Sequence, residues 1–269
     1  FTHAGIVPAA HIARWDGTAW SKLGPNPYSG LTFGSGTNSM AVWGQGAGPD
    51  ELYVMSDVVG ANFNGVSRWN GTQWRAAAST SLYYWYLGYT EGKPSKLWSL
   101  DPDGPGPAVR TLYAAQTEIS AYQTYGATFG SVWVLPSPGG AWQRAGFSPE
   151  SPRFGRVDDM VVFDDDGPGP GQPALYVTRY TNEYWNEPMP PFPPLGFESE
   201  AKISKVVDAS TVDIVSTSTG AYTSLAVFDA DGAGPGPAQL YVGGDFSVGA
   251  QSHVHLARLD GTTLTPLGS

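Results

Sequence analysis

The sequence predicts an all-β fold, and three features of its 269 residues support that prediction. Turn-forming residues are frequent, with 35 glycines and 23 prolines, and they separate short apolar stretches rich in β-branched and aromatic residues. No stretch of useful length has the apolar period of an amphipathic helix. Hydrophobic residues make up 41% of the chain and aromatic residues 13%, which is enough to fill a large core.

One hairpin recurs about every 60 residues along the chain. An apolar strand runs into a loop rich in Asp and Gly and returns as a strand that contains Leu-Tyr. The clearest copy is LAVFDADGAGPGPAQLYVGGDF, which begins at Leu225. Other copies begin at Leu97 and Met160, and a weaker one begins at Met40. We call this unit the inner hairpin.

A second hairpin, which we call the outer hairpin, follows each inner hairpin, and one further copy precedes the first. Its clearest copies are IARWDGTAWSKLG (Ile12–Gly24), VSRWNGTQWRAAA (Val66–Ala78) and LARLDGTTLTPLG (Leu256–Gly268). Looser copies occupy Val132–Gly146 and Ile203–Thr217. Asp-Gly or Asn-Gly between two strands is a strong signal for a type I′ turn.

The type I′ turn also predicts which residues pair across each outer hairpin. With the turn centred on Asp-Gly or Asn-Gly, a small residue faces a large one in each clear copy, as expected where a bulky side chain covers its partner strand. The expected pairs are Ala13 with Trp20, Ser67 with Trp74, and Ala257 with Leu264.

Two hairpins per repeat make four strands, and four-stranded units repeated several times are typical of a β-propeller. We therefore expect a single propeller domain. Its full blades would cover about residues 40–78, 97–146, 160–217 and 225–268. Residues 1–24 would form an outer half-blade whose inner half is missing, so that the chain makes about five blades. A β-sandwich with Greek-key connections is the alternative, but it does not explain the repeat.

The unmatched half-blade has three interpretations. The chain is a segment of a longer array, or the half-blade packs within the same molecule as an incomplete fifth blade, or its free strand edge pairs with another chain. The first two are favoured, and the third predicts self-association.

The repeat resembles a Kelch repeat in the segments LYVGGDF and HLARLDGTTLTPLG near the C-terminus. It is more similar still to the tandem repeats of large secreted bacterial proteins, typified by planctomycete sequences. The likeness covers nearly the whole chain but weakens in the middle, where the Gly-Gly of residues 243–244 is replaced at 114–115 and 177–178. The resemblance implies a propeller and an extracellular or cell-surface setting, but no particular reaction.

Charge and composition exclude several partners and sites. The net charge is −10 and the isoelectric point is about 4.7, so neither nucleic acid nor an anionic membrane surface is expected to bind. The absence of cysteine excludes disulfides and thiolate metal sites. No apolar run is long enough to insert into a membrane, and the first residues lack a signal-peptide pattern, as expected of a mature or excised segment.

The loops of the inner hairpins carry closely spaced aspartates that suggest a calcium site. Calcium prefers about six to eight oxygen ligands, often from alternating side chains of one loop. The carboxylates concerned are Asp101, Asp103, Asp164, Asp166, Asp229 and Asp231. The position of a third carboxylate holds Pro105, Pro168 or Ala233, so calcium binding would be weak. The favoured alternative is a turn in which Asp side chains accept hydrogen bonds from backbone amides two residues on.

In an up-and-down blade the connection between strands two and three opens on the face opposite these loops. That face receives an insertion loop, RYTNEYWNEPMPPFPPLGFESE, at residues 179–200. Aromatic rings beside carboxylates suit a glycan or protein ligand, whereas a lid that packs its own aromatics on the propeller is the alternative. The candidate contact residues are Tyr180, Glu183, Tyr184, Trp185, Glu187 and Phe192.

No motif of a known catalytic site occurs, and no catalytic residue is assigned. The predicted function is a non-catalytic extracellular binding or scaffold propeller, a module of a surface or filamentous assembly. Apart from weak calcium binding, no cofactor is expected. The alternative is a carbohydrate-active enzyme, either a glycoside hydrolase or a polysaccharide lyase. A lyase would need a His or Tyr base beside a basic residue, for which Tyr180 and Arg179 are candidates.

Overall fold

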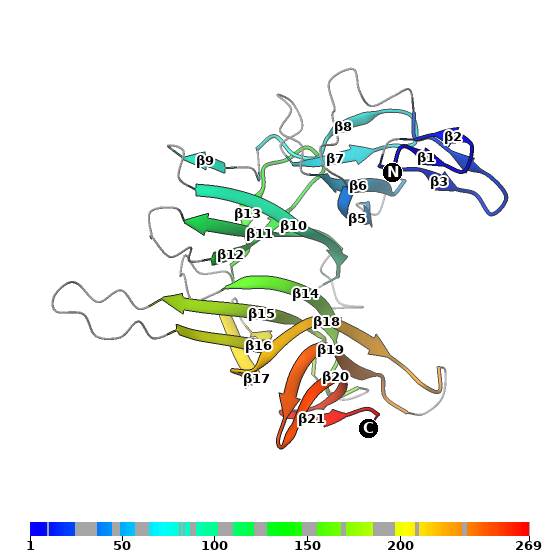
Figure 1. Ribbon diagram of the computed structural model, residues 1–269. Helices are drawn as coiled ribbons and strands as arrows, with labels where there is room; N and C mark the ends of the chain where they lie inside the picture. The colour runs from blue at the N-terminus through cyan, green and yellow to red at the C-terminus, as the bar shows by residue number, and fades with distance from the viewer. Residues whose placement is uncertain are drawn as a thin grey trace. The chain divides into compact units, whose positions relative to one another are not determined.

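The computed structural model confirms the all-β prediction. The residues it describes are 1–9, 11–24, 37–44, 49–56, 65–80, 82, 84–86, 90–101, 110–120, 128–146, 155–167, 171–184, 197–207, 210–232 and 236–268. Their regular secondary structure consists of β-strands (Figure 1). Within these ranges no helix is long and apolar enough to cross a membrane. The predicted site residues Asp103, Trp185, Glu187 and Phe192 lie outside the described residues.

The strands form separate sheets in which each strand pairs with the next one along the chain. Two short pairs near the N-terminus are β1 (His3–Ala4) with β2 (Val7–Pro8), and β3 (Arg14–Trp15) with β4 (Trp20–Ser21). The next sheet contains β5 (Thr37–Trp43), β6 (Glu51–Ser56), β7 (Val66–Trp69) and β8 (Trp74–Ala76).

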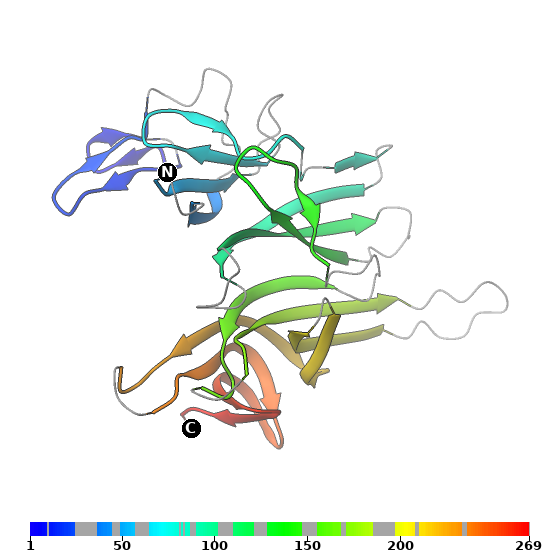
Figure 2. The same ribbon diagram turned by 180° about the vertical axis from the view of Figure 1, so that it is seen from behind.

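Three larger sheets follow, and Figure 2 shows them from behind. A five-stranded sheet contains β9 (Tyr84–Tyr86), β10 (Thr90–Leu100), β11 (Thr111–Ser120), β12 (Thr128–Leu135) and β13 (Gln143–Arg144). A four-stranded sheet contains β14 (Arg156–Phe163), β15 (Ala174–Tyr184), β16 (Phe197–Val207) and β17 (Ser210–Thr217). The last sheet contains β18 (Gly220–Phe228), β19 (Gln239–Val248), β20 (Gln251–Asp260) and β21 (Thr263–Pro266). Each of these sheets is therefore an up-and-down meander.

The chain divides into two compact units, each with its own hydrophobic core. Unit 1 comprises Phe1–Ser99, Val109–Gln116 and Trp133–Gln143, and unit 2 comprises Leu100–Ala108, Thr117–Val132 and Arg144–Ser269. In unit 1 the fully buried Trp43 and Tyr53 have ring centroids 5.3 Å apart. In unit 2 the fully buried Tyr222 and Phe246 have ring centroids 4.9 Å apart. A fully buried aromatic pair thus belongs to each core.

The outer hairpins adopt a different pairing from the one predicted. The observed pairs are Trp15 with Trp20, Trp69 with Trp74, and Leu259 with Leu264. The predicted pairs, which were Ala13 with Trp20, Ser67 with Trp74 and Ala257 with Leu264, are therefore wrong. Two large residues face each other in each hairpin, instead of a small residue facing a large one.

The chemistry of the turn explains this difference. Asp16 occupies the first position of its turn rather than a central one, and its Oδ1 accepts the backbone N–H groups of Thr18 and Ala19, both at 2.9 Å. Asn70 caps the equivalent turn in the same way. The N–H groups of Ala19 and Thr18 lower the pKa of the Asp16 carboxyl to about 2. Gly17 follows with a φ of 102°, which glycine adopts without strain.

The first long strand of three sheets carries a β-bulge at the same place in the repeat. In β5, β14 and β18 the pairing shifts between Thr37 and Ser39, between Val157 and Asp159, and between Tyr222 and Ser224, respectively. This bulge was not predicted from the sequence. The position of the bulge matters because in two of these sheets the residue directly after it, Ser39 or Asp159, forms a hydrogen bond with the following repeat.

That residue accepts a hydrogen bond from the backbone of the next repeat. In unit 1, Ser39 Oγ accepts the N–H of Leu97 on β10 at 2.9 Å. In unit 2, Asp159 Oδ2 accepts the N–H of Leu225 on β18 at 2.9 Å. Leu97 and Leu225 hold equivalent positions in their own inner hairpins. The two hydrogen bonds, which we call the inner-strand links, are therefore the same contact made in two different repeats.

Replacing Asp159 by alanine is expected to lower the free energy of unfolding by about 1–3 kcal/mol, because a buried N–H would lose its acceptor. Asp159 is only 9% exposed. Urea-induced unfolding at neutral pH measures this loss, and Asp159→Asn, which keeps an acceptor oxygen, should recover most of it. The alanine variant should also exchange the Leu225 amide hydrogen faster. An unchanged exchange rate at that amide would contradict the link.

Candidate functional site

Both ends of the predicted binding segment, residues 179–200, belong to the paired strands of one hairpin. Strands β15 and β16 stay paired as far as Tyr184 with Phe197, passing through Glu183 with Glu198. The predicted loop at residues 179–200 therefore begins and ends as strand, because both flanks can continue the antiparallel ladder. The end of β15 lies at the opposite end of its sheet from the Asp-rich connection between β14 and β15, as an antiparallel meander requires.

Tyr180 and Arg179 point to opposite faces of this sheet, as neighbouring strand residues do. Tyr180 is half-buried against the core of unit 2, and the Arg156 guanidinium lies 5.7 Å from its ring centroid. Arg179 is opposite Lys202 across the strands, whereas Tyr180 is opposite Ala201. The pair considered for a lyase therefore does not converge on one substrate position.

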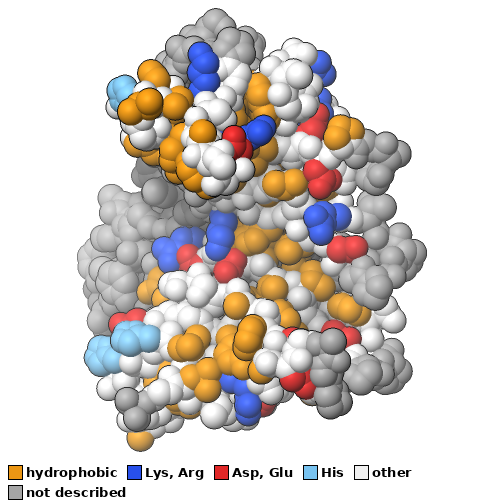
Figure 3. Space-filling model, turned by 90° about the vertical axis from the view of Figure 1, so that its right-hand side faces the viewer, with side chains coloured by type: hydrophobic (Ala, Val, Ile, Leu, Met, Phe, Trp, Pro, Cys, Tyr) orange, Lys and Arg blue, Asp and Glu red, His pale blue; other side chains and the backbone are white. Residues whose placement is uncertain are grey.

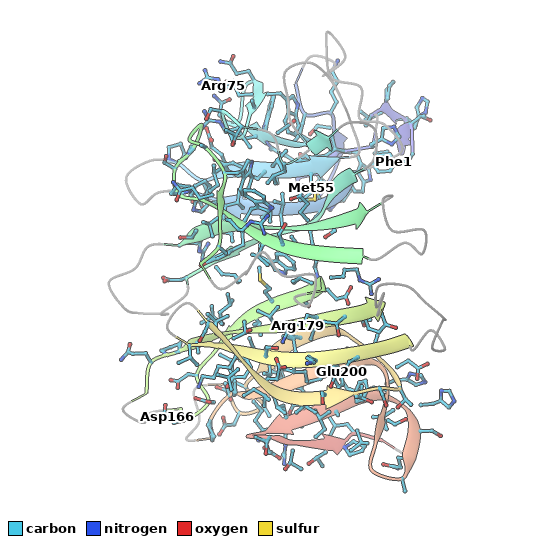
Figure 4. The ribbon with its side chains drawn as sticks, turned by 90° about the vertical axis from the view of Figure 1, so that its left-hand side faces the viewer. Phe1, Met55, Arg75, Asp166, Arg179 and Glu200 are labelled. Carbon is cyan, nitrogen blue, oxygen red and sulfur yellow. The ribbon has the colours of Figure 1, made fainter. Side chains whose placement is uncertain are left out.

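Arg179 belongs instead to a network of charged and polar side chains on one face of the β14–β17 sheet. Its Nη2 lies 2.5 Å from Asp213 Oδ1, and its Nε donates to Ser204 Oγ at 2.9 Å. Ser204 Oγ in turn donates to Asp213 Oδ1 at 2.7 Å. Lys202 Nζ lies 3.1 Å from Asp213 Oδ2 and 3.0 Å from Glu200 Oε2. Figure 4 shows Arg179 and Glu200 on this sheet.

In this network, which we call the Arg179 network, the ionised forms of Asp213 and Lys202 are favoured, because the pKa of Asp213 is lowered and that of Lys202 is raised. Arg179 is only 8% exposed, and Ser204 is fully buried. Burial would raise the pKa of the Asp213 carboxyl, but hydrogen bonds from Arg179, Ser204 and Lys202 outweigh burial and lower that pKa. A general acid needs a raised pKa, so Asp213 is not suited to that role. The arrangement of two cations against two carboxylates is that of a structural ion-pair network.

The sequence analysis missed every member of this network except Arg179. A signal was present in β16, where the polar Lys202 and Ser204 alternate with the apolar Ala201 and Ile203. Such alternation is expected of a strand with two different faces. The partner Asp213 lies 34 residues from Arg179, and no local pattern connects them.

Three neighbouring aspartates lie in the connection between β14 and β15. Each of Asp164, Asp165 and Asp166 offers a carboxylate oxygen within 4.8 Å of the others. Two of them already have partners, because Asp165 Oδ2 lies 2.6 Å from Lys205 Nζ and Asp166 Oδ2 accepts the Gly171 N–H at 2.9 Å. Burial and the neighbouring Asp166 carboxylate raise the pKa of Asp164.

The equivalent loop after β18 makes the same kind of turn. Asp231 Oδ2 accepts the N–H of Gly236 at 2.9 Å, which matches the Asp166–Gly171 contact in the preceding repeat. Asp229 Oδ1 accepts the Asp231 N–H at 3.2 Å, the two-residue spacing that the turn interpretation predicts. Asp101, in the earlier loop, is half-buried at the end of β10. Asp166, Asp229 and Asp231 thus order their own turns, and calcium binding stays a prediction.

Replacing Asp166 by alanine is expected to lower the melting temperature by the same amount in EDTA and in millimolar calcium. The Asp166 carboxylate accepts a backbone N–H, and a turn role loses that contact whether or not calcium is present. Thermal unfolding followed by circular dichroism measures the shift, with Asp231→Ala as the matched variant. A stabilisation by calcium that disappears in both variants would instead favour the calcium site.

The chain was compared with known proteins at the level of families, sequences and structures. No family model matches the chain, and no curated protein or solved structure is significantly similar to it.

Proposed function

We propose that the protein is a non-catalytic binding or scaffold module whose sheets are blades of a β-propeller. The observation that carries this proposal is the inner-strand link, which occurs in both units. Ser39 to Leu97 and Asp159 to Leu225 each join the first strand of one sheet to the corresponding strand of the next repeat. A propeller requires such side-by-side placement of inner strands in consecutive blades. Repeats that contact only their neighbours are suited to building extended binding surfaces.

The chemistry of the described side chains favours binding over catalysis. Asp213, Asp165 and Asp16 have lowered pKa values, and each accepts hydrogen bonds within its own sheet or turn. The pKa of Asp164 is raised, but its neighbours Asp165 and Asp166 already have partners. Active sites more often hold groups whose pKa values are moved toward neutrality. The proposed ligand is a glycan or protein that contacts the connection between β15 and β16. The extracellular setting rests on the resemblance of the repeat.

The test measures binding and product release on the same samples. The protein is incubated with a panel of neutral and acidic polysaccharides. Affinity electrophoresis detects binding, while reducing-end and unsaturated-product assays detect cleavage. Trp185→Ala should abolish binding, and Phe228→Ala, which removes an aromatic side chain that is 58% exposed on β18, should leave it unchanged. Product release that disappears in Glu187→Gln would overturn the proposal in favour of a carbohydrate-active enzyme.

A further inference from the structure

In unit 1 the end of one outer hairpin packs on the tryptophan pair of the next. The rings of Trp69 and Trp74 face each other across their hairpin, with centroids 5.3 Å apart. Leu23, which closes the preceding outer hairpin, is 8% exposed, and its carbonyl oxygen accepts the Trp74 Nε1–H at 3.1 Å. A Cβ on Gly24 would lie only 2.7 Å from the Trp69 ring. The segment Leu23–Gly24 therefore lies directly against the Trp69–Trp74 pair. We call such a contact between consecutive outer hairpins a joint.

The following joint in unit 1 uses the same position of the repeat. Ala77 closes the second outer hairpin, as its N–H donates back to Val66 O at 3.1 Å. Ala77 is fully buried in a cluster with Trp142 of the next outer hairpin. Its carbonyl oxygen accepts the Gly139 N–H at 2.8 Å. In both joints the residue that closes one outer hairpin is buried, and its carbonyl accepts an N–H from the next hairpin.

One tryptophan pair has the geometry of a joint, but among the described residues no Leu-Gly segment packs on it, although Gly5 lies close to Trp20, where a Cβ would be 3.6 Å from Cδ1. The centroids of Trp15 and Trp20 lie 5.2 Å apart with an interplanar angle of 49°, against 5.3 Å and 45° for Trp69 and Trp74. Trp15 is 51% exposed and Trp20 is 44% exposed. Phe1 and Ile6, earlier in the same N-terminal segment, are also exposed apolar side chains. Figure 3 shows that hydrophobic side chains are exposed on one face of the molecule.

One Leu-Gly segment has the conformation of a joint, but no aromatic pair of the described residues packs against it. Leu267 closes the last outer hairpin, where its N–H donates to Leu256 O at 2.9 Å. Gly268 has a φ of 87°, close to the 80° of Gly24. Leu267 is 40% exposed, and a Cβ on Gly268 would meet nothing within 4 Å. This segment therefore resembles Leu23–Gly24 without the partner that buries it.

We propose that the Trp15–Trp20 pair is a docking site for the Leu267–Gly268 segment of a second copy of the chain. The contact would repeat the joint of unit 1, with Trp20 Nε1–H donating to Leu267 O and Gly268 lying against the Trp15 ring. Trp15 and Trp20 take the places of Trp69 and Trp74, so the segment needs no new chemistry. A head-to-tail contact of this kind leaves a free site at each end and therefore builds rings or chains of molecules. The proposal does not require the ligand proposed above.

The experiment is sedimentation velocity over micromolar to millimolar concentrations of the whole chain. The unaltered protein should associate as its concentration rises. Trp20→Ala and Leu267→Asp each remove one half of the contact, and each variant alone should remain monomeric. An equimolar mixture of the two variants should form a dimer and nothing larger, because one intact half remains on each partner. Melting temperatures close to that of the parent protein show that both variants are folded.

Phe228→Ser is the matched control, because it removes an exposed apolar side chain that belongs to neither half. It should associate like the parent protein. A parent protein that stays monomeric at millimolar concentration would overturn the proposal. So would a mixture of Trp20→Ala and Leu267→Asp that fails to pair, or a control that loses association to the same extent.

Discussion

Replacing Gly220 by alanine should lower the free energy of unfolding by about 3–5 kcal/mol, through backbone strain and a steric overlap together. Gly220 opens β18 with a φ of 90°, a region that residues with a Cβ rarely adopt. A Cβ at this position would overlap the carbonyl oxygen of Asp245 and lie 2.8 Å from Phe246 Cα. Both contacts are with the backbone of the paired strand β19, so no side-chain rotation relieves them.

Gly249→Ala is the matched control for this prediction. Gly249 also has a positive φ, 57°, but a Cβ there would meet nothing within 4 Å. Its replacement should cost only about 1 kcal/mol from the backbone conformation. Urea-induced unfolding of both variants separates the two effects. Equal losses in the two variants would show that the close approach of β18 and β19 contributes nothing.

Replacing Arg179 by alanine should lower the free energy of unfolding by about 2–4 kcal/mol, because it leaves Asp213 and Ser204 without their buried partner. The upper end of that range applies to fully buried pairs, and Asp213 is 36% exposed, so water compensates in part. Arg258→Ala is the control, since it breaks an ion pair with Asp260 whose side chains are 34% and 50% exposed. It should cost about 0–1 kcal/mol. Similar losses in both variants would contradict a special role for the Arg179 network.

The effect of Arg179→Ala should also depend on pH. The pKa of Asp213 is lowered in the folded protein, so its stabilising contribution is complete above the unfolded carboxyl pKa of about 4. That contribution is lost as the pH falls through the lower folded value. The stability difference between the parent protein and Arg179→Ala should therefore stay constant near neutral pH and shrink in acid. A difference that grows on acidification would contradict this assignment.

Local signals in the sequence were sufficient for the inner and outer hairpins, but they did not predict the β1–β2 pair or the fifth strand of the β9–β13 sheet. Asp-Gly turns and Leu-Tyr strands predicted the hairpins, since turn chemistry and alternation act over a few residues. The pairing of the outer hairpins was shifted, because Asp16 can stand at the first or at a central position of a turn. Only the hydrogen bonds to Thr18 and Ala19 distinguish these positions.

The Arg179 network and the inner-strand links were beyond sequence reasoning for a different reason. Both join residues far apart in the chain, such as Asp159 and Leu225, which are 66 residues apart. Asp159 reads as an ordinary surface carboxylate until the bulge before it is known. Tyr180 was predicted as a ligand contact because an aromatic lies beside carboxylates, and its half-buried ring also packs against the core of unit 2. Burial decides such cases, and burial depends on the tertiary structure.

The inner-strand link also bears on how a protein of this kind can evolve. Its donor is a backbone N–H, which every residue except proline supplies, and its acceptor is Ser39 in one repeat and Asp159 in another. The donor half therefore sets no requirement on the side chain of the next repeat, whereas the acceptor half does, since the equivalent position before Leu97 holds Lys96, whose side chain has no acceptor atom. The donor position can therefore diverge without loss of the link, provided that it does not become proline. Divergence of that kind would keep the architecture regular while the sequence repeat stays clear near both ends of the chain and becomes weak in the middle.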